Sequence, residues 1–121
     1  MSNIRKTLII LLTLEVVIIS YFSLKNPGHG MQLRINDKIG HFIAYSILSL
    51  NTYLVFGFNP IKRGLFFLSV LMGMGIILEI LQKLIPGREC SFFDIIANSV
   101  GIGLGIALYF WYKLQSRSKI F

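Results

Sequence analysis

The chain has 121 residues, of which 55% are hydrophobic and only 14% charged, with a mean hydropathy of +0.71 and a formal net charge of +7. A soluble domain of this length normally carries about a quarter charged residues, so the composition excludes an ordinary soluble fold and predicts a membrane protein. The positive charge then serves orientation and attraction to anionic lipid, and we do not expect nucleic acid as a partner.

Four apolar stretches predict transmembrane helices, at residues 7–24, 39–58, 64–85 and 93–112. Each is close to the ~20 residues that cross a ~30 Å hydrocarbon core as a helix. The polar segments between them are short and contain Asn, Gly or Pro, which leaves no room for another domain. We therefore predict an all-α integral membrane bundle with short loops, forming a single domain over residues 1–121.

The first stretch follows Arg5 and Lys6, as the apolar core of a signal peptide would. It is longer than the roughly 7–15 residues of such a core and no small-residue cleavage site follows, so we expect it to remain as the first helix. Cys90 is the only cysteine, which excludes an intramolecular disulfide and a thiolate metal cluster. We expect no cofactor.

Basic residues predict the orientation of the bundle. The side with both termini and the second loop carries seven of them: Arg5, Lys6, Lys62, Arg63, Lys113, Arg117 and Lys119. The other side carries five: Lys25, Arg34, Lys38, Lys83 and Arg88. By the positive-inside rule, both termini are predicted to be cytoplasmic, with the first and third loops outside a multi-pass cell-membrane protein.

Polar side chains reach the same outer depth on three of the predicted helices. They are Asp37, Lys38 and His41 on the second, Glu79 and Gln82 on the third, and Asp94 and Asn98 on the fourth. A charged group at the bilayer centre costs about 2.5–3.5 kcal/mol on insertion scales, so these side chains should turn inward and pair, or face a water-filled cavity. The candidate pairs are Arg88 with Asp94 or Glu79, and Lys38 with either acid.

Helical spacing places each group on a face. One face holds Asp37, His41 and Tyr45, a second holds Glu79, Gln82 and Lys83, and a third holds Asp94, Asn98, Gly101 and Gly105. A structural interpretation also exists: Gln82 and Asn98 as amide clamps between helices, and His41 as a neutral hydrogen-bonding residue. Glu15 is assigned to packing or to a protonated carboxyl. Tyr109, Trp111 and Tyr112 predict an interfacial aromatic belt.

These residues resemble the motif set of VanZ-like membrane proteins. The resemblance spans roughly residues 37–105 and rests on Asp37, Lys38, His41, Glu79, Gln82, Pro86, Gly87, Arg88, Ser91, Asp94, Asn98 and Gly101. It implies a small integral membrane protein, in a family named for a protein that confers low-level resistance to the glycopeptide teicoplanin, and it names no reaction. Glu89 departs from the small or neutral residue expected there, which leaves the pairing of Arg88 open.

Three functions remain open. The first is recognition of a lipid-linked or anionic envelope molecule at the outer side, with the ligand set Asp37, Lys38, His41, Glu79, Gln82, Arg88, Ser91, Asp94 and Asn98. The second is an enzyme that uses His41, Glu79 and Asp94 as acid and base on an envelope lipid. The third is a structural subunit of a larger complex. A divalent ion among Asp37, His41, Glu79 and Asp94 is less favoured than pairing with the nearby Lys and Arg, so no metal is expected.

Overall fold

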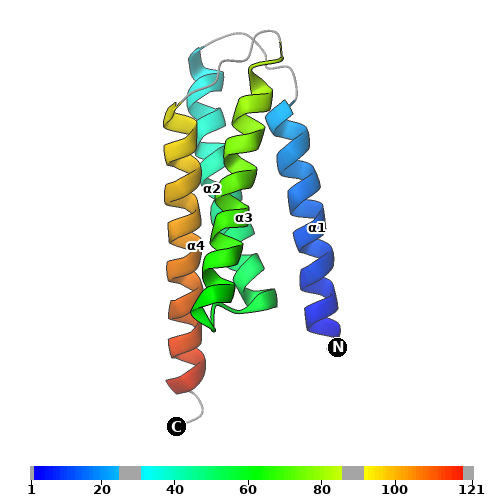
Figure 1. Cartoon of the computed structure of the whole chain (residues 1–121), viewed down its shortest axis with the longest axis vertical. Helices are drawn as coiled ribbons and strands as arrows, with labels where there is room; N and C mark the ends of the chain where they lie inside the picture. The colour runs from blue at the N-terminus through cyan, green and yellow to red at the C-terminus, as the bar shows by residue number, and fades with distance from the viewer. Residues whose placement is uncertain (1, 25–30, 86–91, 119–121) are drawn as a thin grey trace.

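The described part of the chain consists of four α-helices joined by short segments (Figure 1). The computed structural model describes residues 2–24, 31–85 and 92–118, and within the second helix it describes side chains from Lys38 onward. The helices are α1 (Asn3–Leu24), α2 (Met31–Phe56), α3 (Ile61–Gln82) and α4 (Phe92–Ser118). Each is long and apolar enough to cross a membrane, which confirms the predicted all-α bundle of four spans.

Some helix ends differ from the boundaries that the sequence predicted. The second helix begins at Met31, earlier than the apolar stretch predicted from residue 39, because a helix continues as long as its backbone hydrogen bonds do. The third helix ends at Gln82, and the next three backbone N–H groups bond to carbonyls three residues earlier. This tightening agrees with the proline at position 86, which disfavours α-helical geometry in the residue before it.

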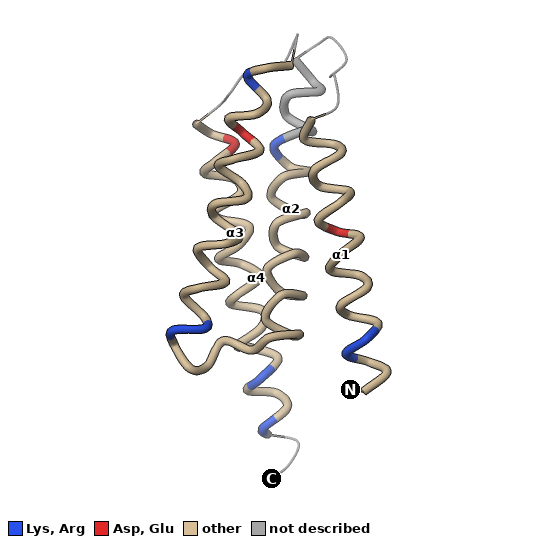
Figure 2. Tube along the Cα trace, turned by 45° about the vertical axis from the view of Figure 1, so that its right-hand side comes forward, with Lys and Arg blue, Asp and Glu red and all other residues tan. Residues whose placement is uncertain are grey.

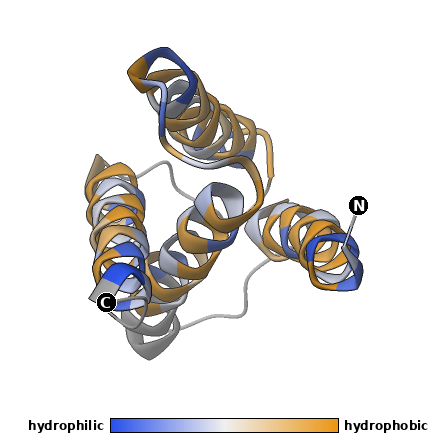
Figure 3. Ribbon diagram, turned by 90° about the horizontal axis from the view of Figure 1, so that it is seen from below, coloured by the Kyte–Doolittle hydropathy of each residue, from blue (hydrophilic) through white to orange (hydrophobic). Residues whose placement is uncertain are grey.

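The second helix lies at the centre of the bundle. Viewed along the bundle from below, α1, α3 and α4 surround it (Figure 3), and α4 has the most extensive contact with it. Half of the residues in the apolar segment of α2 are buried, compared with 11% of those in the apolar segment of α1. The first helix is therefore the least buried of the four, and its buried side chains are Ile19 and Ser23.

Two glycines of α4 permit a very close approach to α2. A Cβ atom on Gly105 would lie 2.5 Å from the Ser46 carbonyl oxygen and 2.9 Å from the Leu50 nitrogen. A Cβ atom on Gly101 would lie 2.5 Å from the carbonyl oxygen of Phe42. These are backbone atoms, which cannot shift without moving the helix to which they belong, so only glycine fits at either position. Small residues of this kind let membrane helices pack by close van der Waals contact.

Hydroxyl groups add hydrogen bonds along the buried side of α2. Ser49 Oγ donates across the interface to the carbonyl oxygen of Ile102, at 3.1 Å. Towards the end of the bundle that holds the termini, the Tyr53 hydroxyl donates to the carbonyl oxygen of Gly64 at 2.9 Å, which joins α2 to the beginning of α3. These bonds satisfy polar atoms that the hydrocarbon could not.

The predicted aromatic belt is only partly correct. Trp111 and Tyr112 are exposed, as a belt requires, but Tyr109 is buried, with 4% of its surface accessible. Tyr109 lies four residues after Gly105 and continues the inward stripe of α4, where its ring packs against Tyr53. Its hydroxyl accepts a hydrogen bond from the backbone N–H of Phe58, at 3.4 Å. Tyr109 therefore closes the core and does not face the bilayer.

Charged residues lie near the two ends of the bundle, with little charge between them apart from an acidic position on α1 (Figure 2). Both chain termini lie at one end (Figure 1). The described basic residues at that end are Arg5, Lys6, Lys62, Arg63, Lys113 and Arg117. The acidic residues of α3 and α4 lie towards the opposite end, where α2 and α4 begin and α3 ends.

The contact between α2 and α4 predicts a specific sensitivity to one methyl group. Gly105→Ala should lower the unfolding free energy by about 1–3 kcal/mol, because the new Cβ overlaps Ser49 and the α2 backbone. Gly103→Ala is the matched control, since a Cβ there meets nothing within 4 Å. Reversible unfolding in mixed detergent micelles measures both variants. Equal stability of the two would contradict the packing described.

Candidate functional site

Buried polar side chains from α2, α3 and α4 gather towards the end of the bundle away from the termini. None of the described members has more than 8% of its surface accessible, apart from Lys38 at the rim. We call this group the polar cluster, and its buried members are His41, Glu79, Gln82, Asp94 and Asn98. The three helices thus bring together residues that the sequence predicted to share one depth. The stripe of Asp94, Asn98, Gly101 and Gly105 is buried throughout.

A hydrogen bond joins α2 and α4 inside the cluster. The Nδ1 atom of His41 lies 3.0 Å from the side-chain oxygen of Asn98. Because an amide oxygen only accepts hydrogen bonds, this arrangement requires the proton on Nδ1. The third helix makes room for the same amide at Gly75, where an added Cβ would lie 3.1 Å from the Asn98 nitrogen. The predicted role of Asn98 as a clamp between helices therefore agrees with the geometry.

An ion pair lies at the rim of the cluster. The Nζ atom of Lys38 is 3.2 Å from a carboxylate oxygen of Asp94. The lysine side chain is 39% exposed and that of Asp94 only 5%, so the cation extends from the aqueous interface onto a buried acid. This is one of the pairs that the sequence predicted. The alternative partner, Arg88, lies outside the described residues.

Glu79 and Tyr45 bring α3 and α2 together at the inner side of the cluster. Both are almost completely buried, with 1% and 0% of their surfaces accessible. The carboxyl group lies close enough to the tyrosine hydroxyl to interact with it electrostatically. An added Cβ on Gly75, one helical turn before Glu79, would lie 3.6 Å from the Tyr45 hydroxyl oxygen. The absence of a side chain at Gly75 thus admits both Tyr45 and Asn98.

Gln82 differs from the other amide of the cluster. It is completely buried, yet neither its side-chain oxygen nor its nitrogen has a hydrogen-bond partner among the described residues. Leaving a buried polar group unpaired costs about 1–3 kcal/mol. Within the described structure, Gln82 therefore does not act as the interhelical clamp that its sequence position suggested. Its amide is available for a partner that the helices themselves do not supply.

Some predicted site residues are not placed in the cluster. Arg88, Ser91 and the side chain of Asp37 lie outside what the structure describes. Lys83 is exposed, so it does not share the buried side of Glu79 and Gln82. Among the described side chains, no group of three His, Cys, Asp or Glu residues is arranged to hold a metal ion.

The sequence did not lead us to select Asn51 or Tyr45 as site residues. Asn51 of α2 donates a hydrogen bond from its amide nitrogen to a carboxyl oxygen of Glu15 on α1, at 3.2 Å. Asn51 and Glu15 are polar residues within apolar spans, and this shared feature could have predicted that they pair. Tyr45 was recognised as sharing the His41 face but was not chosen as a site residue. Its spacing of four residues from His41 was the signal.

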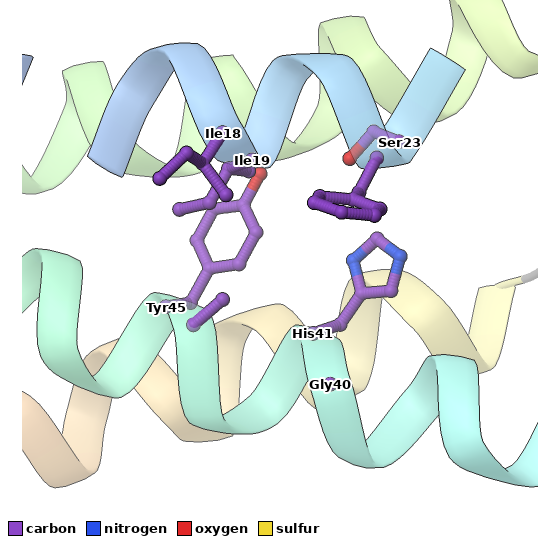
Figure 4. A pocket seen from close by; sticks show the side chains of 8 residues that line it. Ile18, Ile19, Ser23, Gly40, His41 and Tyr45 are labelled. Carbon is purple, nitrogen blue, oxygen red and sulfur yellow. The ribbon is translucent and has the colours of Figure 1, made fainter. Parts of the chain in front are cut away.

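A cavity of about 290 Å³ lies between α1 and α2, next to the polar cluster (Figure 4). Its walls include Ile18, Ile19, Ser23, Gly40, His41 and Tyr45. His41 belongs to the polar cluster and Tyr45 to the core beside it, so the cavity adjoins both. The geometry thus combines a polar group of side chains with an adjoining space that is mostly apolar.

Comparison with known proteins gives a match to one family. The VanZ/LLP1 family model matches residues 2–113. An uncharacterized protein of the fission yeast Schizosaccharomyces pombe is 29% identical over 122 aligned positions, which cover 97% of this chain and 71% of the yeast protein. No solved structure matches the chain.

Substitution of Gln82 tests whether its buried amide stabilises the fold. Gln82→Leu removes an amide without a partner in the described structure, so we expect the unfolding free energy to stay the same or rise. Asn98→Leu removes the acceptor of the His41 hydrogen bond and should lower the unfolding free energy by about 1–3 kcal/mol. Unfolding in mixed micelles compares the two. A large loss of stability in Gln82→Leu would show that Gln82 is structural.

Proposed function

The chain belongs to the VanZ/LLP1 family of membrane proteins, and from this premise we propose that it contributes to tolerance of the cell envelope towards glycopeptides such as teicoplanin. In this proposal the polar cluster faces outward and recognises a lipid-linked or anionic envelope molecule. The fungal relative leads us to define that molecule by its chemistry, a charged or polar headgroup on a hydrocarbon chain, and not as one named precursor.

The observation that carries the proposal is a set of buried polar atoms without hydrogen-bond partners in and beside the polar cluster. Both amide atoms of Gln82 and the hydroxyl of Tyr45 lack a hydrogen-bond partner among the described residues. Each such group costs stability, and proteins commonly keep destabilising groups where function requires them. A polar group of a bound molecule that reached these atoms would supply the missing hydrogen bonds.

The rim of the cluster suits an anionic headgroup. Lys38 combines a positive charge with access to the interface, and its partner Asp94 holds it in place. A phosphate that approached Lys38 would meet a compact cation with three donors. We expect Asp37, Arg88 and Ser91 to complete this rim, as the family resemblance implies, with Arg88 able to bind a phosphate through two parallel hydrogen bonds.

Two contacts within the cluster hold candidate ligand residues in place. His41 is hydrogen-bonded to the amide of Asn98, and Asp94 is paired with Lys38. These two contacts fix the positions of the His41 and Asp94 side chains, as recognition of a headgroup requires.

Three substitutions test the proposed function. Glu79→Gln, His41→Ala and Arg88→Ala should each reduce teicoplanin tolerance of a bacterial host to that of cells without the protein, because each alters a member of the proposed ligand set. The minimum inhibitory concentration measures the effect, and the amount of protein in the membrane fraction must match wild type. Gly103→Ala is the control and should keep full tolerance. Wild-type tolerance in all three variants would refute the proposal.

The outward-facing site also requires the predicted orientation in the cell membrane. Cys90 falls in the third loop predicted from the sequence, so a membrane-impermeant maleimide should label it in intact cells. In Cys90→Ser combined with Gln115→Cys, labelling should appear only after the membrane is permeabilised, because the carboxyl terminus is predicted to be cytoplasmic. The reverse pattern would place the polar cluster on the cytoplasmic side and contradict recognition from outside.

A further inference from the structure

The two ends of the cavity between α1 and α2 differ in polarity. Ser23 of α1 and His41 of α2 lie at one end, while Ile18, Ile19 and the ring of Tyr45, whose hydroxyl is the polar atom there, form the other and mostly apolar end (Figure 4). The polar end is the one nearer the start of α2, and so nearer the interface. The apolar end extends towards the middle of the membrane span. This division matches a molecule with a polar group and a hydrocarbon chain.

The cavity opens sideways from the bundle. Ile18 and Phe22, which contribute to its α1 wall, are 52% and 57% exposed. In the α2 wall, a Cβ on the exposed Gly40 would meet nothing within 4 Å. Both walls belong to helices that span the membrane, so the surroundings of the opening are hydrocarbon. The occupant would therefore enter from the bilayer.

We infer that this cavity holds one hydrocarbon chain of an anionic lipid, with its headgroup beside Ser23 and His41. The volume of about 290 Å³ is at the lower limit of the ~300–1,000 Å³ typical of ligand pockets, which suits part of a chain and leaves the headgroup outside. Lys38 lies one turn before His41 on the interfacial side, and the N–H groups of its ammonium that do not face Asp94 can donate to the headgroup.

This inference deepens the proposed function and rests on it, because the chain and the headgroup belong to one ligand. His41 faces the cavity while its Nδ1 atom bonds to Asn98 in the polar cluster. Tyr45 likewise forms part of the cavity wall and interacts with Glu79. A chain seated against these two residues would hold its headgroup at the rim of the cluster.

Photo-crosslinking in vesicles tests the inference directly. The full chain is placed in phosphatidylcholine vesicles that contain a small fraction of phosphatidylglycerol with a diazirine in its acyl chain. After irradiation, peptide mapping should find labelling concentrated at residues 18–23 and 40–45. Gly40→Leu should abolish this excess by filling the cavity, whereas Gly103→Leu, also at a position open to its surroundings, should leave it unchanged. Ala44→Leu, in the same wall, is a second variant that does not depend on the folding of the first.

The labelling results test the lipid site and the requirement for an anionic headgroup separately. Labelling spread evenly over the lipid-facing residues, or unchanged in both Gly40→Leu and Ala44→Leu, would overturn the inference. Equal labelling by a phosphatidylcholine probe of the same chain would overturn the requirement for an anionic headgroup. Specific labelling together with wild-type tolerance in Glu79→Gln, His41→Ala and Arg88→Ala would support the lipid site and refute only the proposed function.

Discussion

Gly101 and Gly105 allow the backbone of α4 to lie against that of α2, closer than any residue with a Cβ atom would permit. In a bilayer the lipid tails are as apolar as the side chains, so helices associate through close packing and interhelical hydrogen bonds. The same interface continues to the bond between His41 and Asn98. The position of the polar cluster is therefore a consequence of how closely these two helices pack.

Much of this arrangement could be predicted because the bilayer restricts the possibilities. Its thickness sets the length of an apolar span, so four stretches of suitable length predicted the four helices. The cost of burying polar groups in hydrocarbon turned Glu79, Asp94 and Asn98 inward, as helical spacing suggested. The pair of Lys38 with Asp94 was among the few that charge and depth allowed.

The remaining features depend on side-chain directions that spacing alone does not specify. Several donors and acceptors reach the same depth, so the sequence could not show that His41 bonds to Asn98. Tyr109 is an aromatic residue of the type found at membrane interfaces, yet it lies on the buried face of α4. The cavity beside Gly40 arises where two helix surfaces fail to fill the space between them, a property of neither sequence segment alone.

The order of the spans has a consequence for how the protein is made. The second helix has the lowest mean hydropathy of the four, and its main neighbour, α4, is synthesised last. Domains and segments emerge from the ribosome starting at the amino terminus, so α2 enters the bilayer before Ile102 and Asn98 exist to receive its hydrogen bonds. The bond from Asn51 to Glu15 needs only the first two spans. This contact can therefore retain the least apolar helix beside its predecessor during insertion, until the last span arrives.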